Sequence, residues 1–324
     1  MIDFRDQSGR DERTESVCVI APSLALSVMI EHDESGNGAD IHLHPAGQGF
    51  WIARLLAQLG CRAVLCGPVG GEPGAVLETL VPMWGVEFAA VRTSRPTTCV
   101  IEDRRNGTAR EVARERKLTM HRHDVDQLFD SVFELALSTA VTVVTGRASE
   151  VCVPLSFFQR LGEDLAATGV ETVGDLHGPE LGAFLESGRL SVLKISDEDL
   201  VEDGIVAEAN DVSIGAAIRL LDRYGIGWLV VSQAERGAVV ALNGRILKAK
   251  PPILRAVDHR GSGDSMTAAL TAALMRGLDG ETAVRLACAA GAANVTRHGL
   301  GSASAGLIEQ LAEHIQIEPM EVPL

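Results

Sequence analysis

The stretch Asp258-His259-Arg260-Gly261-Ser262-Gly263-Asp264-Ser265-Met266 runs directly into a small-residue segment of helical character, Thr267 to Leu274. A glycine-flanked turn that opens a helix directs several unpaired backbone N–H groups, and the positive end of the helix dipole, at one point. Such a point suits a phosphoryl group in transfer, which needs positioning, electrostatic stabilisation and an acceptor for the hydroxyl proton. Asp264 is placed to accept that proton. On this segment alone an alternative stays open, in which the glycines form an ordinary turn and Asp264 only caps the helix.

Outward from this turn, buried strand-like runs alternate with helical segments. Apolar and β-branched runs predict strands at 17–21, 63–66, 88–91, 140–144, 171–175, 192–195 and 228–232. Helical spacing of apolar residues predicts helices at 50–59, 75–84, 125–137, 155–167 and 214–224. This alternation indicates an α/β fold with a doubly wound, mostly parallel sheet flanked by helices.

Two segments interrupt the alternation, at about 24–45 and 94–115. Each combines short strand-like runs with a turn, Ser35-Gly36-Asn37-Gly38 in the first and Asn106-Gly107 in the second. Together they predict a small β-sheet lid that stands off the main sheet and covers an active site. The expected organisation is one α/β domain over 17–324 after a polar N-terminal extension, 1–16.

The composition limits the classes of protein to consider. A chain of 324 residues with 46% hydrophobic content can bury a substantial core. A formal net charge of −15 argues against a nucleic-acid partner, which would require clustered lysine and arginine. No apolar run approaches the ~20 residues of a membrane span, and residues 1–16 lack the apolar centre of a secretory signal. Six cysteines without a CxxC pair are typical of a reducing compartment, so a soluble, cytoplasmic protein without a membrane partner is expected.

Histidine and glycine motifs suggest two rival classes. His42-x-His44 and His121-x-His123 each place two imidazoles on one side, as in a metal-dependent hydrolase, but no cluster with metal-ligand spacing follows them. Gly47-x-Gly49 begins like a dinucleotide fingerprint, but Ile52 occupies the third glycine position. No G-x-x-x-x-G-K-[ST] segment occurs. Both classes are less favoured than phosphoryl transfer.

The turn Gly261–Asp264 resembles the second signature of the PfkB carbohydrate kinases, which have the ribokinase-like fold. Its amino-acid sequence is most similar to the branch that contains 1-phosphofructokinase and tagatose-6-phosphate kinase. Further segments match that family in order along nearly the whole chain: Ala46–Arg54 with Leu59-Gly60, Gly67–Gly71, Asp175–Gly178, Val230–Ser232 with Gly237, and Ala290–Asn294.

The resemblance implies an ATP-dependent kinase that transfers the γ-phosphate to a hydroxyl of a sugar or sugar phosphate, with magnesium carried by ATP. Asp264 would be the catalytic base, and the amides of Gly261, Ser262 and Gly263 would form the anion hole. The nucleotide site maps to Lys194, Ser232, Gly237 and the stretch around Ala293. Gly47 and Gly49 would let the backbone approach the sugar. The resemblance also implies a homodimer formed through the lid.

Several positions depart from the family pattern. Trp51 replaces an asparagine that contacts the sugar, and Ala25 stands where the branch has a carboxylate for sugar hydroxyls. The branch sequence Lys-Pro-Asn-x-x-Glu, linked with phosphates and magnesium, is Lys194-Ile195-Ser196-Asp197-Glu198-Asp199 here. The resemblance therefore assigns Ser196 to the nucleotide site and Asp199 to magnesium, as weaker substitutes.

The departures bear on the substrate. Arg95, beside the second hairpin, falls near the place where the branch holds the phosphate already present on the sugar, and Arg147 could join it. Trp51 would narrow the pocket. The alternative is that both arginines form surface ion pairs and Trp51 belongs to the core. A non-enzymatic alternative also stays open: a kinase-like sugar- or nucleoside-binding protein with lost or altered catalysis.

Overall fold

The computed structural model describes residues 16–33, 38–106, 109–115, 119–146, 153–252, 254, 260–296 and 303–321. Arg147, most of the first predicted hairpin turn and Gly107 of the second lie outside the described residues. Within the described ranges, no helix combines the length and the apolar character needed to cross a membrane.

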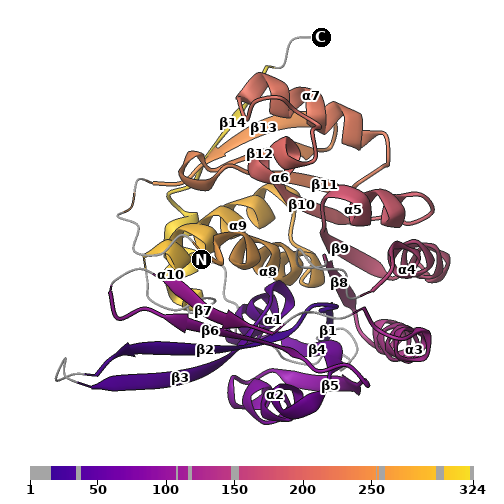
Figure 1. The fold of residues 1–324 in the computed structure, drawn as a ribbon. Coiled ribbons are helices and arrows are strands. Elements are labelled where there is room, and N and C mark those ends of the chain that lie inside the picture. The colour runs from indigo at the N-terminus through magenta and orange to yellow at the C-terminus, as the bar shows by residue number, and fades with distance from the viewer. Residues whose placement is uncertain are drawn as a thin grey trace.

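A ten-stranded sheet forms the centre of the molecule, in the order β14-β13-β12-β11-β10-β9-β8-β1-β4-β5 (Figure 1). The strands from β11 to β5 are all parallel, whereas β12, β13 and β14 add an antiparallel edge. The predicted mostly parallel sheet is therefore confirmed. The strands are β1 (Ser16–Ile20), β4 (Arg62–Val69), β5 (Glu87–Arg92), β8 (Val141–Thr145), β9 (Glu171–Asp175), β10 (Val192–Ser196), β11 (Trp228–Ser232), β12 (Ala238–Leu242), β13 (Arg245–Lys250) and β14 (Gln316–Pro319).

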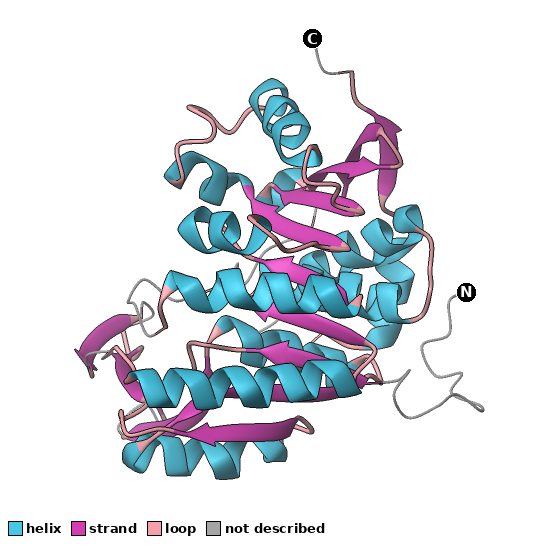
Figure 2. Ribbon diagram, turned by 90° about the vertical axis from the view of Figure 1, so that its right-hand side faces the viewer, coloured by secondary structure: helices cyan, strands magenta, loops and turns pink. Residues whose placement is uncertain are grey.

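Helices cover both faces of this sheet because its central strands are apolar on both sides. In β1, Val17 and Val19 belong to one core cluster, while Cys18 and Ile20 belong to the other. The first layer consists of α1 (Gln48–Gln58), α2 (Gly71–Met83), α8 (Ser262–Met275), α9 (Gly280–Val295) and α10 (Ala305–Ala312). The second consists of α3 (Arg122–Ser138), α4 (Leu155–Thr168), α5 (Gly178–Leu185), α6 (Asp197–Glu202) and α7 (Asp211–Asp222). Figure 2 shows helices of the second layer in front of the sheet, running roughly alongside its strands.

The predicted lid is present as a separate four-stranded sheet in the order β3-β2-β6-β7 (Figure 1). Its strands are β2 (Ala25–His32), β3 (Ala39–Ala46), β6 (Thr98–Asp103) and β7 (Arg110–Arg114). Each of the two hairpins is antiparallel, and parallel pairing of β2 with β6 joins them into one sheet.

The carboxyl ends of adjacent parallel strands bring polar residues together. Lys194 on β10 pairs with Asp175 on β9, and Ser196 pairs with Ser232 on β11. The first turn of α8 reaches the same edge, because the hydroxyl of Thr267 donates to the carboxylate of Asp175 at 2.5 Å. Ligands of open α/β sheets bind at this edge, so the fold itself indicates where to look for a site.

Candidate active site

The glycine-rich turn opens α8 as the sequence predicts. Gly261 is the N-cap residue, with a φ of 71° in the left-handed region that glycine adopts without strain. Its carbonyl accepts hydrogen bonds from the amide of Ser265 at 3.0 Å and from the hydroxyl of Ser265 at 2.8 Å. Ser262 and Gly263 are the first residues of the helix, where backbone N–H groups lack intrahelical acceptors. The turn therefore has the geometry of an anion-binding site.

Asp264 lies in the first turn of α8, close to the ends of the central strands. Burial raises the pKa of its carboxyl to about 7, the nearby charge of Asp175 adds to the rise, and Lys194 opposes it. Near neutral pH this carboxyl exchanges a proton readily, unlike an ordinary aspartate. It can therefore act as an acid or a base at the mouth of the turn.

A buried ion pair lies beneath Asp264. Lys194 is 5% exposed, and its Nζ lies 3.4 Å from Oδ1 of Asp175. Burial alone would lower the pKa of Lys194, but the carboxylates of Asp175, Asp264 and Asp199 raise it above its ordinary value. Lys194 therefore holds a fixed positive charge. The segment that begins at Asp175 resembles the family, but the sequence analysis assigned Asp175 itself no role. The signal that could have identified it is an acidic residue at the carboxyl end of a buried strand.

Gly263 lies between the turn and the ammonium group of Lys194. A Cβ built on Gly263 would lie 2.6 Å from Nζ of Lys194, closer than real Cβ contacts. Glycine at this position therefore lets the ammonium of Lys194 lie directly against the start of α8. A side chain at position 263 would displace the end of Lys194 from the turn.

Ser196 and Asp199 form a reciprocal capping box at the start of α6. The amide of Asp199 donates to Oγ of Ser196 at 3.0 Å, and the amide of Ser196 donates to Oδ2 of Asp199 at 2.9 Å. The other oxygen of Asp199 lies 3.9 Å from Nε2 of His177. Both residues thus have structural partners, and one carboxylate oxygen of Asp199 is not used by the cap.

A cavity of about 400 Å³ opens beside the turn. It is lined by Ala234, Glu235, Gly237, Pro251, Pro252, Leu254, Ser262, Met266, Cys288, Gly291, Ala292 and Val295. Gly237, predicted for the nucleotide site, lines it, and so does Ser262 of the turn. Ser232 is buried, with its hydroxyl 3.5 Å from the carbonyl of Ile195. Ala293 is fully buried in the core, while its neighbour Ala292 lines the cavity.

The two glycines of the N-terminal signature, Gly47 and Gly49, lie where a side chain would collide with the loop after β1. Gly47 has a φ of 115°, and a Cβ there would lie 2.5 Å from the carbonyl oxygen of Ser23. A Cβ on Gly49 would lie 2.6 Å from the Cβ of Ala21. The start of α1 therefore packs directly against the loop after β1.

Trp51 packs beside aromatic and cationic neighbours. Its ring lies 4.9 Å from that of Phe50 in an edge-to-face arrangement, and the guanidinium of Arg54 lies 5.7 Å from it. Trp51 is half-buried against the main core cluster. Among the described residues, those that line the pocket around Arg95 do not include Trp51.

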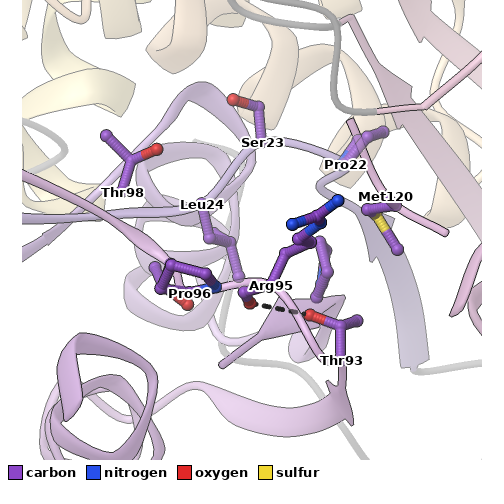
Figure 3. Close-up of a pocket in the computed structure, with 10 residues that line it drawn as sticks. Pro22, Ser23, Leu24, Thr93, Arg95, Pro96, Thr98 and Met120 are labelled. Carbon is purple, nitrogen blue, oxygen red and sulfur yellow. Dashed lines mark hydrogen bonds between the residues drawn. The ribbon is translucent and has the colours of Figure 1, made fainter. Parts of the chain in front are cut away.

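Arg95 enters a small pocket of about 40 Å³ between the lid and the main sheet. The pocket is lined by Pro22, Ser23, Leu24, Pro68, Thr93, Arg95, Pro96, Thr97, Thr98 and Met120. Figure 3 shows the guanidinium extending toward Pro22 and Met120. Nε of Arg95 is buried and has no hydrogen-bond partner among the described residues.

The histidine pairs differ in their surroundings from a metal site. The rings of His42 and His44 on β3 stack at 6.2 Å, and His44 also lies 5.9 Å from Trp84. In the part of the chain that the structure describes, no group of three or more histidine, cysteine, aspartate or glutamate side chains is arranged to hold a metal ion. His121 is the N-cap residue of α3.

Comparison with known proteins agrees with this geometry. A family model described as pfkB family carbohydrate kinase matches residues 16–174 and 183–305. The ATP-dependent 6-phosphofructokinase isozyme 2 of Mycobacterium tuberculosis is 29% identical over 282 residues, 86% of this chain and 81% of that protein. The tagatose-6-phosphate kinase of Staphylococcus epidermidis is 22% identical over 273 residues, 84% of this chain and 87% of that protein.

The fold is also similar to a solved structure. Phosphofructokinase-2 from Escherichia coli, crystallised with fructose-6-phosphate, superposes with a TM-score of 0.74 at 21% identity, covering 92% of this chain and 98% of that chain. Because the family model spans most of the residues that build both sheets and the α8 turn, the chain belongs to the pfkB family of carbohydrate kinases.

Proposed function

We propose that this kinase transfers the γ-phosphate of ATP to a hydroxyl of a phosphorylated sugar, with Asp264 as the general base. The observation that carries the proposal is the position of Asp264 at the start of α8, behind the Gly261–Gly263 turn, with a pKa raised to about 7. A general base is most effective when its pKa lies near the working pH. The carboxylate accepts the hydroxyl proton as the oxygen attacks phosphorus.

The neighbouring residues supply charge and position. The amides at the start of α8 stabilise the equatorial oxygens of the transferring phosphoryl group. The fixed charge of Lys194 adds to that stabilisation from beneath the turn. Asp175 holds Lys194 in place and accepts from Thr267, so β9, β10 and α8 are tied together where the phosphoryl group passes.

The residues present fit ATP and magnesium. The cavity beside the turn is lined mainly by small and apolar side chains, which suit a base and ribose, and Gly237 is among the residues that line it. The carboxylate oxygen of Asp199 that the cap does not use, 3.9 Å from Nε2 of His177, is a hard ligand of the kind magnesium prefers. ATP would supply the phosphoryl group and magnesium would neutralise its charge, with Ser232 and Ser196 near the phosphates.

Arg95 supports a phosphorylated acceptor. Its Nε is buried and has no hydrogen-bond partner among the residues that the structure describes, which costs free energy unless a ligand accepts the hydrogen bond. The pocket is small, and Ser23, Thr97 and Thr98 are among the residues that line it, so it suits a compact anion better than a sugar ring. Arginine grips phosphate through charge-assisted bonds. We place the phosphate already on the sugar here, and Gly47, Gly49 and Trp51 on the side of the sugar ring.

The test is a phosphotransfer assay over matched sugars and sugar phosphates. Arg95→Ala is expected to lower kcat/KM by ~10-fold or more for phosphorylated sugars only, since a charged hydrogen bond is worth ~1.5–3 kcal/mol. Arg147→Ala is tested alongside as the second proposed cation. Arg92→Ala is the control, because Arg92 is exposed and paired with Glu78. Equal losses on both sugar classes would reject the phosphate site.

A second candidate is a binding protein with lost turnover. The observations that favour it are the missing carboxylate at Ala25 and the packing of Trp51 against Phe50. It predicts ligand-dependent stabilisation without ADP production in the same assay. Turnover of any sugar phosphate that depends on Asp264 would reject it.

The lid also offers a dimer contact. On β3, Ile41 and Leu43 are 62% and 42% exposed, and they point to the same side because strand residues alternate. They pair with Ile30 and Val28 of β2, which extends the apolar surface. We call these four residues the apolar lid face and propose that it packs against the same face of a second copy.

A further inference from the structure

The loop that carries Arg95 joins the main sheet to the lid. It follows β5, the edge strand of the main sheet, and precedes β6 of the lid. A flexible loop would let a long arginine side chain turn out to solvent. The contacts of this loop therefore determine whether Arg95 can point into its pocket.

One side of the loop is fixed to the segment after β4. The amide of Thr93 donates to the carbonyl of Val69 at 2.8 Å, and the amide of Thr97 donates to the carbonyl of Gly70 at 2.9 Å. The amide of Gly70 donates in return to Oγ1 of Thr97 at 3.0 Å. The carbonyl of Arg95 accepts from Oγ1 of Thr93 at 3.1 Å (Figure 3).

The other side is fixed by one buried carboxylate. Oδ2 of Asp124 accepts from Oγ of Ser94 at 2.6 Å and from the amide of Ser94 at 3.2 Å. Asp124 is 6% exposed and lies in the first turn of α3, where the helix dipole favours a negative charge. The hydrogen bond from Ser94 also lowers the pKa of Asp124, so the carboxylate stays ionised.

These contacts connect the loop to the pocket wall. Met120, four residues before Asp124, lines the same pocket as Arg95. Ser94 adjoins Arg95 directly, so its two bonds to Asp124 restrict the backbone from which the guanidinium extends. A loop held at Val69 and Gly70 on one side and at Asp124 on the other keeps the orientation seen in Figure 3.

We propose that Asp124 is a positioning residue that orients Arg95 and so sets the preference of the enzyme for phosphorylated sugars. The inference rests on the proposed phosphate site at Arg95. Asp124 does not touch the sugar; it acts through Ser94 on the direction of the arginine. Loss of the Asp124 carboxylate weakens binding of the phosphate already on the sugar and leaves the chemistry at Asp264 intact.

The experiment measures kinetics on a sugar phosphate and on the matching free sugar. Asp124→Ala removes the acceptor of both bonds from Ser94 and is expected to raise KM for the sugar phosphate about 5- to 10-fold, with kcat within about 2-fold and the free sugar unaffected. Ser94→Ala removes the hydroxyl that donates to Asp124 and is expected to act in the same direction. Asp126→Ala removes an exposed carboxylate from the same helix and is expected to change nothing.

A double-mutant cycle separates positioning from general damage. If Asp124 acts through Arg95, Asp124→Ala adds no further loss when Arg95 is already alanine. A full additional loss in that background, or equal losses on both sugars, overturns the role of Asp124. Wild-type selectivity that survives in Arg95→Ala instead overturns the phosphate site itself, so the two failures are distinguishable.

Discussion

At the scale of single residues, the chemistry depends on how burial and charge act on Asp264. The carboxyl lies near a negative partner, Asp175, and a positive one, Lys194, and burial is the larger effect. The result is a pKa near neutrality, which suits a base but makes the ionised form costly in the folded protein. The role proposed for Asp264 and the stability of the folded protein therefore favour opposite protonation states of this carboxyl.

Asp264→Asn is expected to lower kcat by at least ~10²-fold, as the loss of a general base does. The wild-type kcat/KM is expected to rise with pH through about 7, the pKa of Asp264, because the base must be deprotonated. A variant that retains the wild-type rate would show that another group accepts the proton.

The same substitution is expected to alter stability in a pH-dependent way. The folded state holds the proton on Asp264 up to about pH 7, whereas an unfolded aspartate releases it near pH ~4. Between these values the folded state binds more protons, so this carboxyl makes the free energy of unfolding fall as pH rises. Asp264→Asn should therefore raise Tm more at pH 8 than at pH 5. Equal Tm differences at both pH values would contradict the raised pKa.

At Ala234 the backbone conformation itself destabilises the folded state. Its φ is 46°, in the left-handed region that disfavours residues with a Cβ. Ala234→Gly is expected to raise the free energy of unfolding by about 1 kcal/mol in urea titrations without ligand. The same change at Ala216, exposed within α7, is expected to lower it by about 1 kcal/mol. A loss of stability at both positions would rule out strain at Ala234.

At the scale of elements, the site depends on the approach of α8 to β10. The contact is made by Gly263 above the ammonium of Lys194. Because Gly263 has no side chain, the ammonium of Lys194 can lie directly against the start of α8. We propose that the helix N-terminus and the buried cation act together for this reason.

Gly263→Ala tests this contact. The new methyl group would displace the flexible end of Lys194, so folding should survive while the cation moves away from Asp264. We expect kcat to fall about 10-fold or more and the free energy of unfolding to change by less than about 1 kcal/mol. Gly182→Ala, where a Cβ meets open space in α5, serves as the control. Unchanged kcat in Gly263→Ala would show that Lys194 is not part of the transfer.

At the scale of the whole molecule, the lid adds a second sheet whose outer surface is partly apolar. The exposed Ile41 and Leu43 are not needed by the core of one chain. Such a surface is typical of an interface. The lid could therefore serve both the active site and the assembly.

The apolar lid face predicts a dimer that single polar substitutions disrupt. Sedimentation of the wild type at micromolar concentration is expected to show a dimer, and Leu43→Ser is expected to shift it to monomer. Asp40→Ser, which lies on the opposite side of β3, should leave the dimer intact. A wild type that sediments as a monomer would refute the proposed contact.

Some features follow from the sequence because their signals are local. The period of apolar residues predicted α1, α2, α3, α4 and α7 and the seven parallel strands, and turn-forming residues predicted the lid hairpins. The helices α5, α6, α9 and α10 were not predicted. The glycines around Ser262 predicted a turn that opens a helix, and the structure has it at Gly261. The antiparallel edge formed by β12, β13 and β14 was not predicted, because short edge strands have weak periodicity.

Only the tertiary structure brought Asp175, Lys194 and Asp264 together, because their approach depends on strand order and on the packing of α8, which local patterns do not encode. The same reason applies to Arg95, whose direction depends on Val69, Gly70 and Asp124, all distant in sequence. By itself the sequence determined which residue types were available and on which elements they lie. The fold decided which of them share a site, since burial and proximity set the pKa of a carboxyl and the direction of an arginine.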